Sequence, residues 1–159
     1  MVKLKNKIEV HRTKEGTIFE LVFLALAIIL WGYVFWLVNH LPDQIPTHFD
    51  ALGKADKYGS PTALIYPVLI TSVVGLCVMA GAYFPSTWNM PFELKTPNQW
   101  AHAIRLMRIT SILVLLLGAA IVFSMSMSIS SPNGLPIIIY SVVMLAIGIG
   151  YALYIYKIR

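Results

Sequence analysis

A polar segment at residues 41–61, LPDQIPTHFDALGKADKYGSP, holds the side chains of this chain that are best suited to chemistry. Within it, His48 lies close in sequence to Asp50 and Asp56. An imidazole with carboxylates suits zinc or manganese, and it also resembles a general base with the group that orients it. One histidine with loosely spaced aspartates is a weak metal signal. The pattern favours a structural pair that fixes the loop, and it leaves ligand recognition and a metal or catalytic site as alternatives.

The backbone around this group is predicted to be extended and then to turn. Pro42 and Pro46 bias their neighbours toward extended conformations. Alternation of apolar and polar residues over 45–50 gives this stretch one apolar side, which would lie over the ends of helices. Residues 51–53 can turn the chain, and residues 54–59 then return it toward the next apolar run.

Long apolar runs surround this segment and predict an all-α membrane protein. Of the 159 residues, 58% are hydrophobic and 12% are charged, whereas a soluble domain carries about 25% charged residues. An apolar run of about 20 residues is long enough to span the hydrocarbon core of a bilayer. We therefore expect one domain over residues 1–159, with spans at about 17–39, 61–84, 105–129 and 135–156 and a loop at 40–60.

Capping residues mark the starts of two of these helices. Ser60-Pro61 places a capping hydroxyl before a proline that has no amide to leave unpaired. Thr96-Pro97-Asn98-Gln99 matches a capping box. A helix from Pro97 to about Ile129 is longer than one span needs, so its first two turns, which include Trp100, should lie at or in the interface. The residues of these turns that we expect to face lipid headgroups, or alternatively to contact a partner, are His102, Arg105 and Arg108.

The distribution of Lys and Arg predicts the orientation in the membrane, because cytoplasmic segments carry the excess of these residues. The N-terminal segment holds five, the second connection three and the C-terminus two, whereas the first loop holds two. We therefore expect both termini in the cytoplasm and the 41–61 loop outside. The net charge of +5 comes from helix ends, which indicates a lipid bilayer rather than nucleic acid as the partner.

The spans lack the residues that ion-coupled transport requires. No Asp, Glu, Lys, Arg or His falls in the middle of a span, although such residues usually mark ion pathways in membranes. The sequence also contains no P-loop, no H-E-x-x-H and no G-x-S-x-G motif. We therefore expect neither enzymatic activity nor a cofactor.

Small residues at four-residue spacing can allow helices to approach closely. Such patterns occur at Cys77-x-x-x-Gly81 and at Ala146-x-x-x-Gly150. They are common by chance, and they leave an oligomer open without predicting one.

The 41–61 loop resembles the signature of the DUF1648 membrane family, in which Leu-Pro-x-x-Ile-Pro-x-His-Phe precedes a Gly, an Asp and a Tyr-Gly. The matching residues are Leu41, Pro42, Ile45, Pro46, His48, Phe49, Gly53, Asp56, Tyr58 and Gly59. Many relatives have Asn where this chain has Asp50. The resemblance implies a protein of the bacterial cytoplasmic (inner) membrane, and it makes these residues except Leu41, together with Asp50, the candidate site.

The same domain occurs in SdpI-like immunity proteins, which resemble a longer design that resists a secreted toxin and signals to a repressor. This chain ends after its fourth expected helix, so we expect the first module alone. Our leading hypothesis is that the 41–61 loop recognises a peptide, a toxin or an envelope partner, as in immunity or signalling. The alternatives are a small structural or accessory subunit of a membrane complex and, less favoured, a membrane enzyme or metal site.

Overall fold

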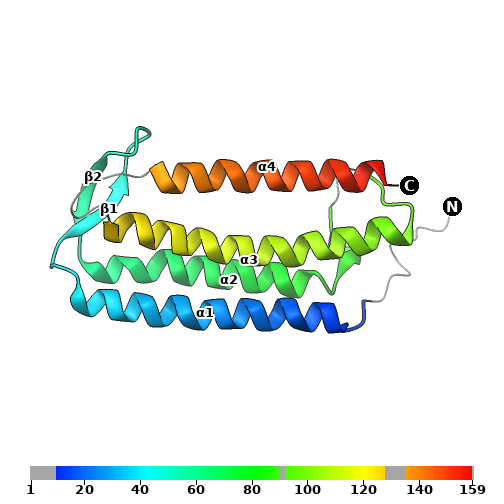
Figure 1. Cartoon of the computed structure of the whole chain (residues 1–159), viewed down its shortest axis with the longest axis horizontal. Coiled ribbons are helices and arrows are strands. Elements are labelled where there is room, and N and C mark those ends of the chain that lie inside the picture. The colour runs from blue at the N-terminus through cyan, green and yellow to red at the C-terminus, as the bar shows by residue number, and fades with distance from the viewer. Residues whose placement is uncertain (1–9, 90–91, 128–134, 159) are drawn as a thin grey trace.

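The computed structural model describes residues 10–89, 92–127 and 135–158. These form helices that run up and down, with a small β-hairpin at one end of the bundle (Figure 1). The helices are α1 (Lys14–His40), α2 (Ile65–Gly81), α3 (Pro97–Met127) and α4 (Leu135–Lys157). Four helical segments of the described chain are long and apolar enough to cross a membrane, with mean hydropathies of 2.1 to 2.6. The protein is therefore a mostly helical, multi-pass membrane protein, as predicted.

Both predicted helix starts are confirmed by hydrogen bonds. The Ser60 hydroxyl accepts from the Thr62 amide and begins a 3-10 turn, η2 (Pro61–Leu64), which leads into α2. At α3 the Gln99 amide donates to the Thr96 hydroxyl at 3.2 Å, while the Gln99 side-chain oxygen accepts from the Thr96 amide at 3.1 Å. This reciprocal pair is a capping box.

Helix α2 ends at Gly81, before the expected end of its span at residue 84. The indole nitrogen of Trp88 donates to the Gly81 carbonyl at 2.9 Å, which satisfies an acceptor that a helix end leaves free. The chain then makes a second 3-10 turn, η3 (Pro85–Thr87). The expected end of the third span at residue 129 lies outside the described residues.

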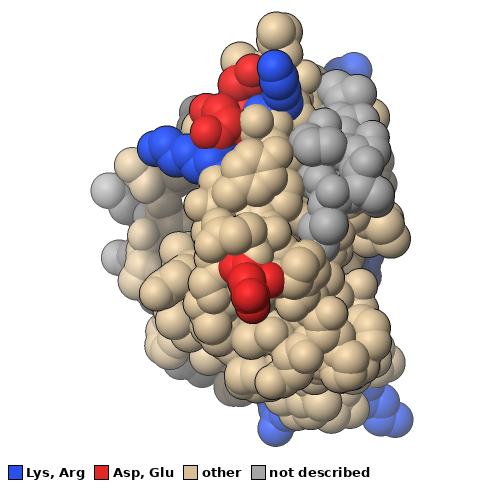
Figure 2. All heavy atoms as spheres, turned by 90° about the vertical axis from the view of Figure 1, so that its left-hand side faces the viewer, with Lys and Arg blue, Asp and Glu red and all other residues tan. Residues whose placement is uncertain are grey.

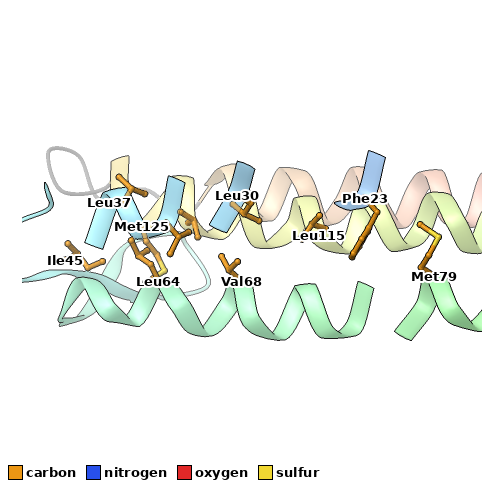
Figure 3. Packing of buried hydrophobic residues seen from close by; sticks show 11 residues of the cluster. Phe23, Leu30, Leu37, Ile45, Leu64, Val68, Met79, Leu115 and Met125 are labelled. Carbon is orange, nitrogen blue, oxygen red and sulfur yellow. The ribbon is translucent and has the colours of Figure 1, made fainter. Parts of the chain in front are cut away.

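The core lies between α1, α2 and α3 (Figure 3). Its buried apolar residues are Phe23, Leu30, Val34, Leu37, Ile45, Leu64, Val68, Met79, Leu115, Val122 and Met125. Helix α3 is central, because it packs on α1, α2 and α4, whereas α4 packs chiefly on α3. Most large apolar side chains of α4 are therefore exposed, as expected where lipid replaces water.

Glycines allow α2 and α3 to approach closely. A Cβ added at Gly118 would lie 2.1 Å from the Thr71 hydroxyl, and one at Gly75 would lie 3.0 Å from the Ser111 carbonyl oxygen. A Cβ at Gly150, by contrast, would meet nothing within 4 Å. The small-residue pattern that ends at Gly150 therefore marks no close helix contact within the described chain.

The hairpin joins α1 to α2. Its strands are β1 (Ile45–Phe49) and β2 (Ala55–Gly59), which pair antiparallel with an irregular register on both sides of His48. An isolated two-stranded hairpin is only marginally stable, so its packing on the helices matters. Ile45 is fully buried and lies at the end of the core near Leu64 and Met125 (Figure 3).

Candidate functional site

The tip of the hairpin is shaped by Asp50 and Gly53. One carboxylate oxygen of Asp50 accepts from the amides of Leu52 and Lys54, both at 2.9 Å. Gly53 has a φ of 80°, a left-handed conformation that glycine adopts without steric cost. Two motif residues thus fix the turn, which agrees with the structural interpretation of this part of the motif.

His48 and Asp56 form a pair across the two strands. The Nδ1 atom of His48 lies 2.5 Å from Oδ1 of Asp56, and the two side chains are 59% and 44% exposed. The hydrogen bond from His48 holds the pKa of Asp56 below its ordinary value of 3.8. A neutral imidazole that donates from Nδ1 has its lone pair on Nε2, and no described residue hydrogen-bonds that atom.

A pocket of about 290 Å³ lies between the hairpin and the neighbouring ends of α3 and α4. Its wall on the hairpin side is polar and its floor is apolar. The lining residues are Thr47, His48, Phe49, Asp50, Gly53, Ile121, Met125, Ile137 and Ile138. The site therefore combines hydrogen-bonding groups with an aliphatic surface.

The remaining motif residues take other positions. Ile45 and Pro46 are buried and hold β1 on the bundle. Gly59 lies against Thr47, because a Cβ added there would be 3.2 Å from the Thr47 methyl carbon. Pro42 and Tyr58 are exposed and do not line the pocket.

The floor of the pocket could not be recognised from the sequence. Ile121 and Met125 come from α3, and Ile137 and Ile138 come from α4. In the sequence they are ordinary apolar residues of membrane spans, far from the motif. Only the antiparallel packing of the helices brings them beneath the hairpin.

The three side chains that could have bound a metal, His48, Asp50 and Asp56, do not converge on one point. The Asp56 carboxylate meets His48, whereas that of Asp50 is turned toward the backbone amides of the turn. Within the described ranges, no group of three or more His, Cys, Asp or Glu side chains is arranged to hold a metal ion. The geometry thus gives the metal alternative no support.

The other candidate residues lie at the opposite end, where the described chain begins and ends (Figure 1). Arg105 makes a bidentate contact with Glu15, with distances of 2.5 and 3.1 Å, and so joins α3 to α1. Nδ1 of His102 lies 3.0 Å from the Tyr151 hydroxyl and joins α3 to α4. These two side chains hold helices together at their ends.

The expectation that Arg108 faces lipid headgroups is wrong, because it is only 4% exposed, and Trp100 is similarly buried at 5% exposure. Trp100 packs against Trp88, with ring centroids 6.1 Å apart. The Arg108 guanidinium lies 5.4 Å from the centroid of the Tyr83 ring. It occupies space that Gly16 leaves open, since a Cβ there would lie 2.8 Å from Nη2.

Arg108 is an unusual buried cation. Its Nε and Nη2 atoms have no hydrogen-bond partner within the part of the chain that the structure describes. Glu15 and Glu20 are nearby acidic groups that interact with it electrostatically. Glu20 also pairs with Arg12 and accepts a hydrogen bond from the Tyr83 hydroxyl. Arg108 is therefore compensated mainly by the field of these carboxylates and by the ring of Tyr83.

Figure 2 views the bundle from its hairpin end. Much of this face is uncharged, and acidic and basic side chains gather near the top of the view, where the hairpin tip lies (Figures 1 and 2). The exposed charged residues of the hairpin are Lys54, Asp56 and Lys57. The tip is thus polar, while the pocket beneath it has an apolar floor.

Comparison with protein families gives a match at residues 25–71 to a domain of unknown function, DUF1648. The match covers the second part of α1, the whole hairpin and the first part of α2. No curated protein and no solved structure matches this chain significantly. The residues that form the hairpin and the polar wall of its pocket therefore lie within the segment that matches DUF1648, and this match supports the family resemblance of the 41–61 motif.

Proposed function

We propose that this protein is a membrane-embedded binding module whose hairpin recognises a peptide or another envelope partner. The observation that supports the proposal is the pocket that opens beside His48 and Asp50. The fold uses Nδ1 of His48 and one oxygen of Asp50 for internal hydrogen bonds. A hydrogen-bonding atom of each side chain is then left for a ligand.

The orientation that we propose places the hairpin outside and both termini in the cytoplasm of a bacterial cell. The excess of Lys and Arg near the termini and in the second connection supports it. A hairpin that faces outward would meet secreted peptides and envelope proteins before any other part of the chain.

Binding rather than catalysis is the activity that the site supports. The His48–Asp56 pair resembles a base and its orienting group, but Thr47 is the only hydroxyl among the described residues of the pocket. The pocket therefore has few groups to act as a nucleophile, whereas its polar wall and apolar floor suit recognition.

The test is the survival of cells that carry a deletion of the gene, challenged with secreted peptide toxins and membrane-active peptides. The deleted strain is complemented with the wild type, His48→Ala or Lys57→Ala, and membrane levels are measured in each. We expect the deletion to sensitise cells, Lys57→Ala to protect and His48→Ala to fail. Lys57 is the matched control, because it is exposed on the same hairpin but does not line the pocket. A deletion without effect would contradict the proposal, and so would full protection by His48→Ala.

A second candidate is a structural or accessory subunit whose hairpin only closes the end of the bundle. The burial of Ile45 and Pro46 and the capping role of Asp50 favour it. On this alternative, His48→Ala lowers the melting temperature in detergent without changing protection. Loss of protection at an unchanged melting temperature would exclude it.

A further inference from the structure

We propose that the hairpin pocket binds an ammonium group next to an aliphatic side chain, as a cationic amphipathic peptide presents them. The proposal rests on the proposed function, since it names the class of ligand for the same site. It follows from the combination of the floor, the wall and the size of the pocket.

The apolar floor of the pocket favours an aliphatic group in the ligand. Ile121, Ile137 and Ile138 provide branched alkyl surface, and Met125 adds a flexible side chain that adapts to different shapes. The volume of about 290 Å³ lies at the lower end of the range of about 300–1,000 Å³ for small-molecule pockets. The pocket therefore has room for one or two aliphatic side chains rather than for a large folded ligand.

The polar wall of the pocket favours a cationic group in the ligand. The second carboxylate oxygen of Asp50 has no hydrogen bond from any described residue, because both amides of the turn donate to the first oxygen. The lone pair of His48 Nε2 is also an acceptor when Nδ1 donates to Asp56. No Lys or Arg is among the described residues that line the pocket. The described lining therefore offers a ligand two acceptors, the charged Asp50 carboxylate and His48 Nε2. It holds no lysine or arginine that would compete with a cationic ligand for them.

An ammonium group fits this wall better than a carboxylate or a hydroxyl. It has three N–H donors and no acceptor, which matches a wall whose free hydrogen-bonding atoms on Asp50 and His48 are acceptors. A carboxylate would meet only acceptors and a like charge. The attraction between the ammonium group and the wall comes from the negative charge of Asp50. The hydrogen bonds of Asp50 in the turn need only an acceptor oxygen and not the charge.

The test measures peptide binding to the full-length protein in nanodiscs. The probes are acetyl-Leu-Lys-Leu-amide and acetyl-Leu-Glu-Leu-amide, which differ only in the charged side chain. The readout is the NMR signal of the His48 ring in protein with isotope-labelled histidine, assigned with His48→Gln. We expect saturable shifts with the lysine peptide and at least tenfold weaker binding of the glutamate peptide. Equal affinities would overturn the proposal.

Asp50→Asn isolates the charge, because the asparagine oxygen can still accept from the amides of Leu52 and Lys54. We expect it to weaken the lysine peptide at least fivefold and to leave the hairpin folded. Unchanged affinity in a folded Asp50→Asn variant would overturn the proposal. The His48 NMR signal could instead shift when phosphatidylethanolamine is added to the nanodisc and not when the lysine peptide is added. That result would overturn the peptide proposal and indicate that the pocket binds a lipid amine.

A pair of neighbouring residues on α4 tests the location. Ile138 lines the pocket and is 40% exposed, whereas Ile139 is 61% exposed and does not line it. We expect Ile138→Trp to fill the pocket and abolish binding, and Ile139→Trp to bind as the wild type does. Equal binding by both variants would show that the peptide binds elsewhere.

The survival assay separates this proposal from the proposed function. If His48→Ala fails to protect cells while Asp50→Asn and Ile138→Trp protect fully, the pocket proposal is wrong and recognition by the hairpin stands. If the lysine peptide binds selectively but the deletion has no effect on survival, the pocket proposal stands and the protective function is wrong.

Discussion

The His48–Asp56 pair uses one nitrogen of the histidine ring for the fold and leaves the other for the ligand that we propose. Nδ1 of the ring closes the hairpin against Asp56, and this bond orients Nε2 for a second contact. The bond also links the hairpin to pH, because it depends on an ionised carboxylate.

Acid should loosen the hairpin through Asp56. The folded pKa of Asp56 lies below its ordinary value of 3.8, so the stabilisation is complete above that value and is lost as the pH falls through the folded pKa. Amide hydrogen exchange of β1 and β2 between about pH 6 and pH 3 would measure it. We expect the protection factors of the wild type, which correct for the intrinsic slowing of exchange in acid, to fall at the acidic end, and those of Asp56→Asn to have a flatter dependence. The same dependence in both proteins would contradict this account.

Arg108 is a charged residue that the sequence places at the membrane interface but that the fold buries, with 4% of its surface exposed. A buried cation without hydrogen bonds on two of its nitrogens carries a desolvation cost. Tyr83, Glu15 and Glu20 offset part of that cost.

Arg108→Met should therefore be neutral or stabilising, because methionine fills a similar space without the charge. Replacing a buried ionic group with apolar side chains is often neutral or stabilising by about 1–4 kcal/mol. The measurement is the melting temperature in detergent, with Glu20→Gln as the contrasting variant. We expect Glu20→Gln to lower it, since Arg108 then loses part of its compensation. A large decrease for Arg108→Met would show that the cation stabilises the fold.

At the scale of the elements, the contact of α2 with α3 depends on glycines in the middle of the spans. A Cβ added at Gly118 would lie 2.1 Å from the Thr71 hydroxyl and 3.2 Å from the Thr71 Cβ, so either the Thr71 side chain or a helix must move to admit a methyl group. The outer faces of α4 have no such constraint within the described chain.

Gly118→Ala should destabilise the bundle by about 1–3 kcal/mol, which is the usual cost of overpacking a core. Gly150→Ala is the matched control, since its added Cβ meets nothing within 4 Å and alanine favours helix more than glycine does. Unfolding of the purified variants in detergent would compare them. Equal stability of the two would contradict this account and show that Thr71 or the helices can make room for a methyl group at no cost.

At the scale of the whole molecule, the hairpin and the described ends of the chain lie at opposite ends of the bundle (Figure 1). The proposed orientation therefore predicts which end can be reached from outside the cell. Leu52 at the hairpin tip is 86% exposed, and Glu93 in the α2–α3 connection is also exposed.

Cysteine labelling would test the orientation in a Cys77→Ser background. Leu52→Cys should react with a membrane-impermeant maleimide in intact cells, whereas Glu93→Cys should react only after the membrane is opened. The reverse pattern would invert the topology and exclude a hairpin that meets secreted peptides. Labelling of both in intact cells would contradict a single orientation.

The sequence by itself determined the features that depend on local chemistry. Long apolar runs indicate membrane helices because lipid tolerates few charged groups. Ser60-Pro61 and the Thr96–Gln99 box fix helix starts because their hydroxyls reach amides only a few residues away. The signature at 41–61 identified the DUF1648 domain.

Only the tertiary structure decided what depends on residues far apart in the chain. The pairing of β1 with β2, and the burial of Arg108 against Gly16, follow from packing rather than from local propensity. The pocket joins a loop to apolar residues of α3 and α4, which no spacing in the sequence distinguishes from residues that face lipid. A motif reports the bonds that its own residues make, whereas a binding surface depends on which helices lie beside it.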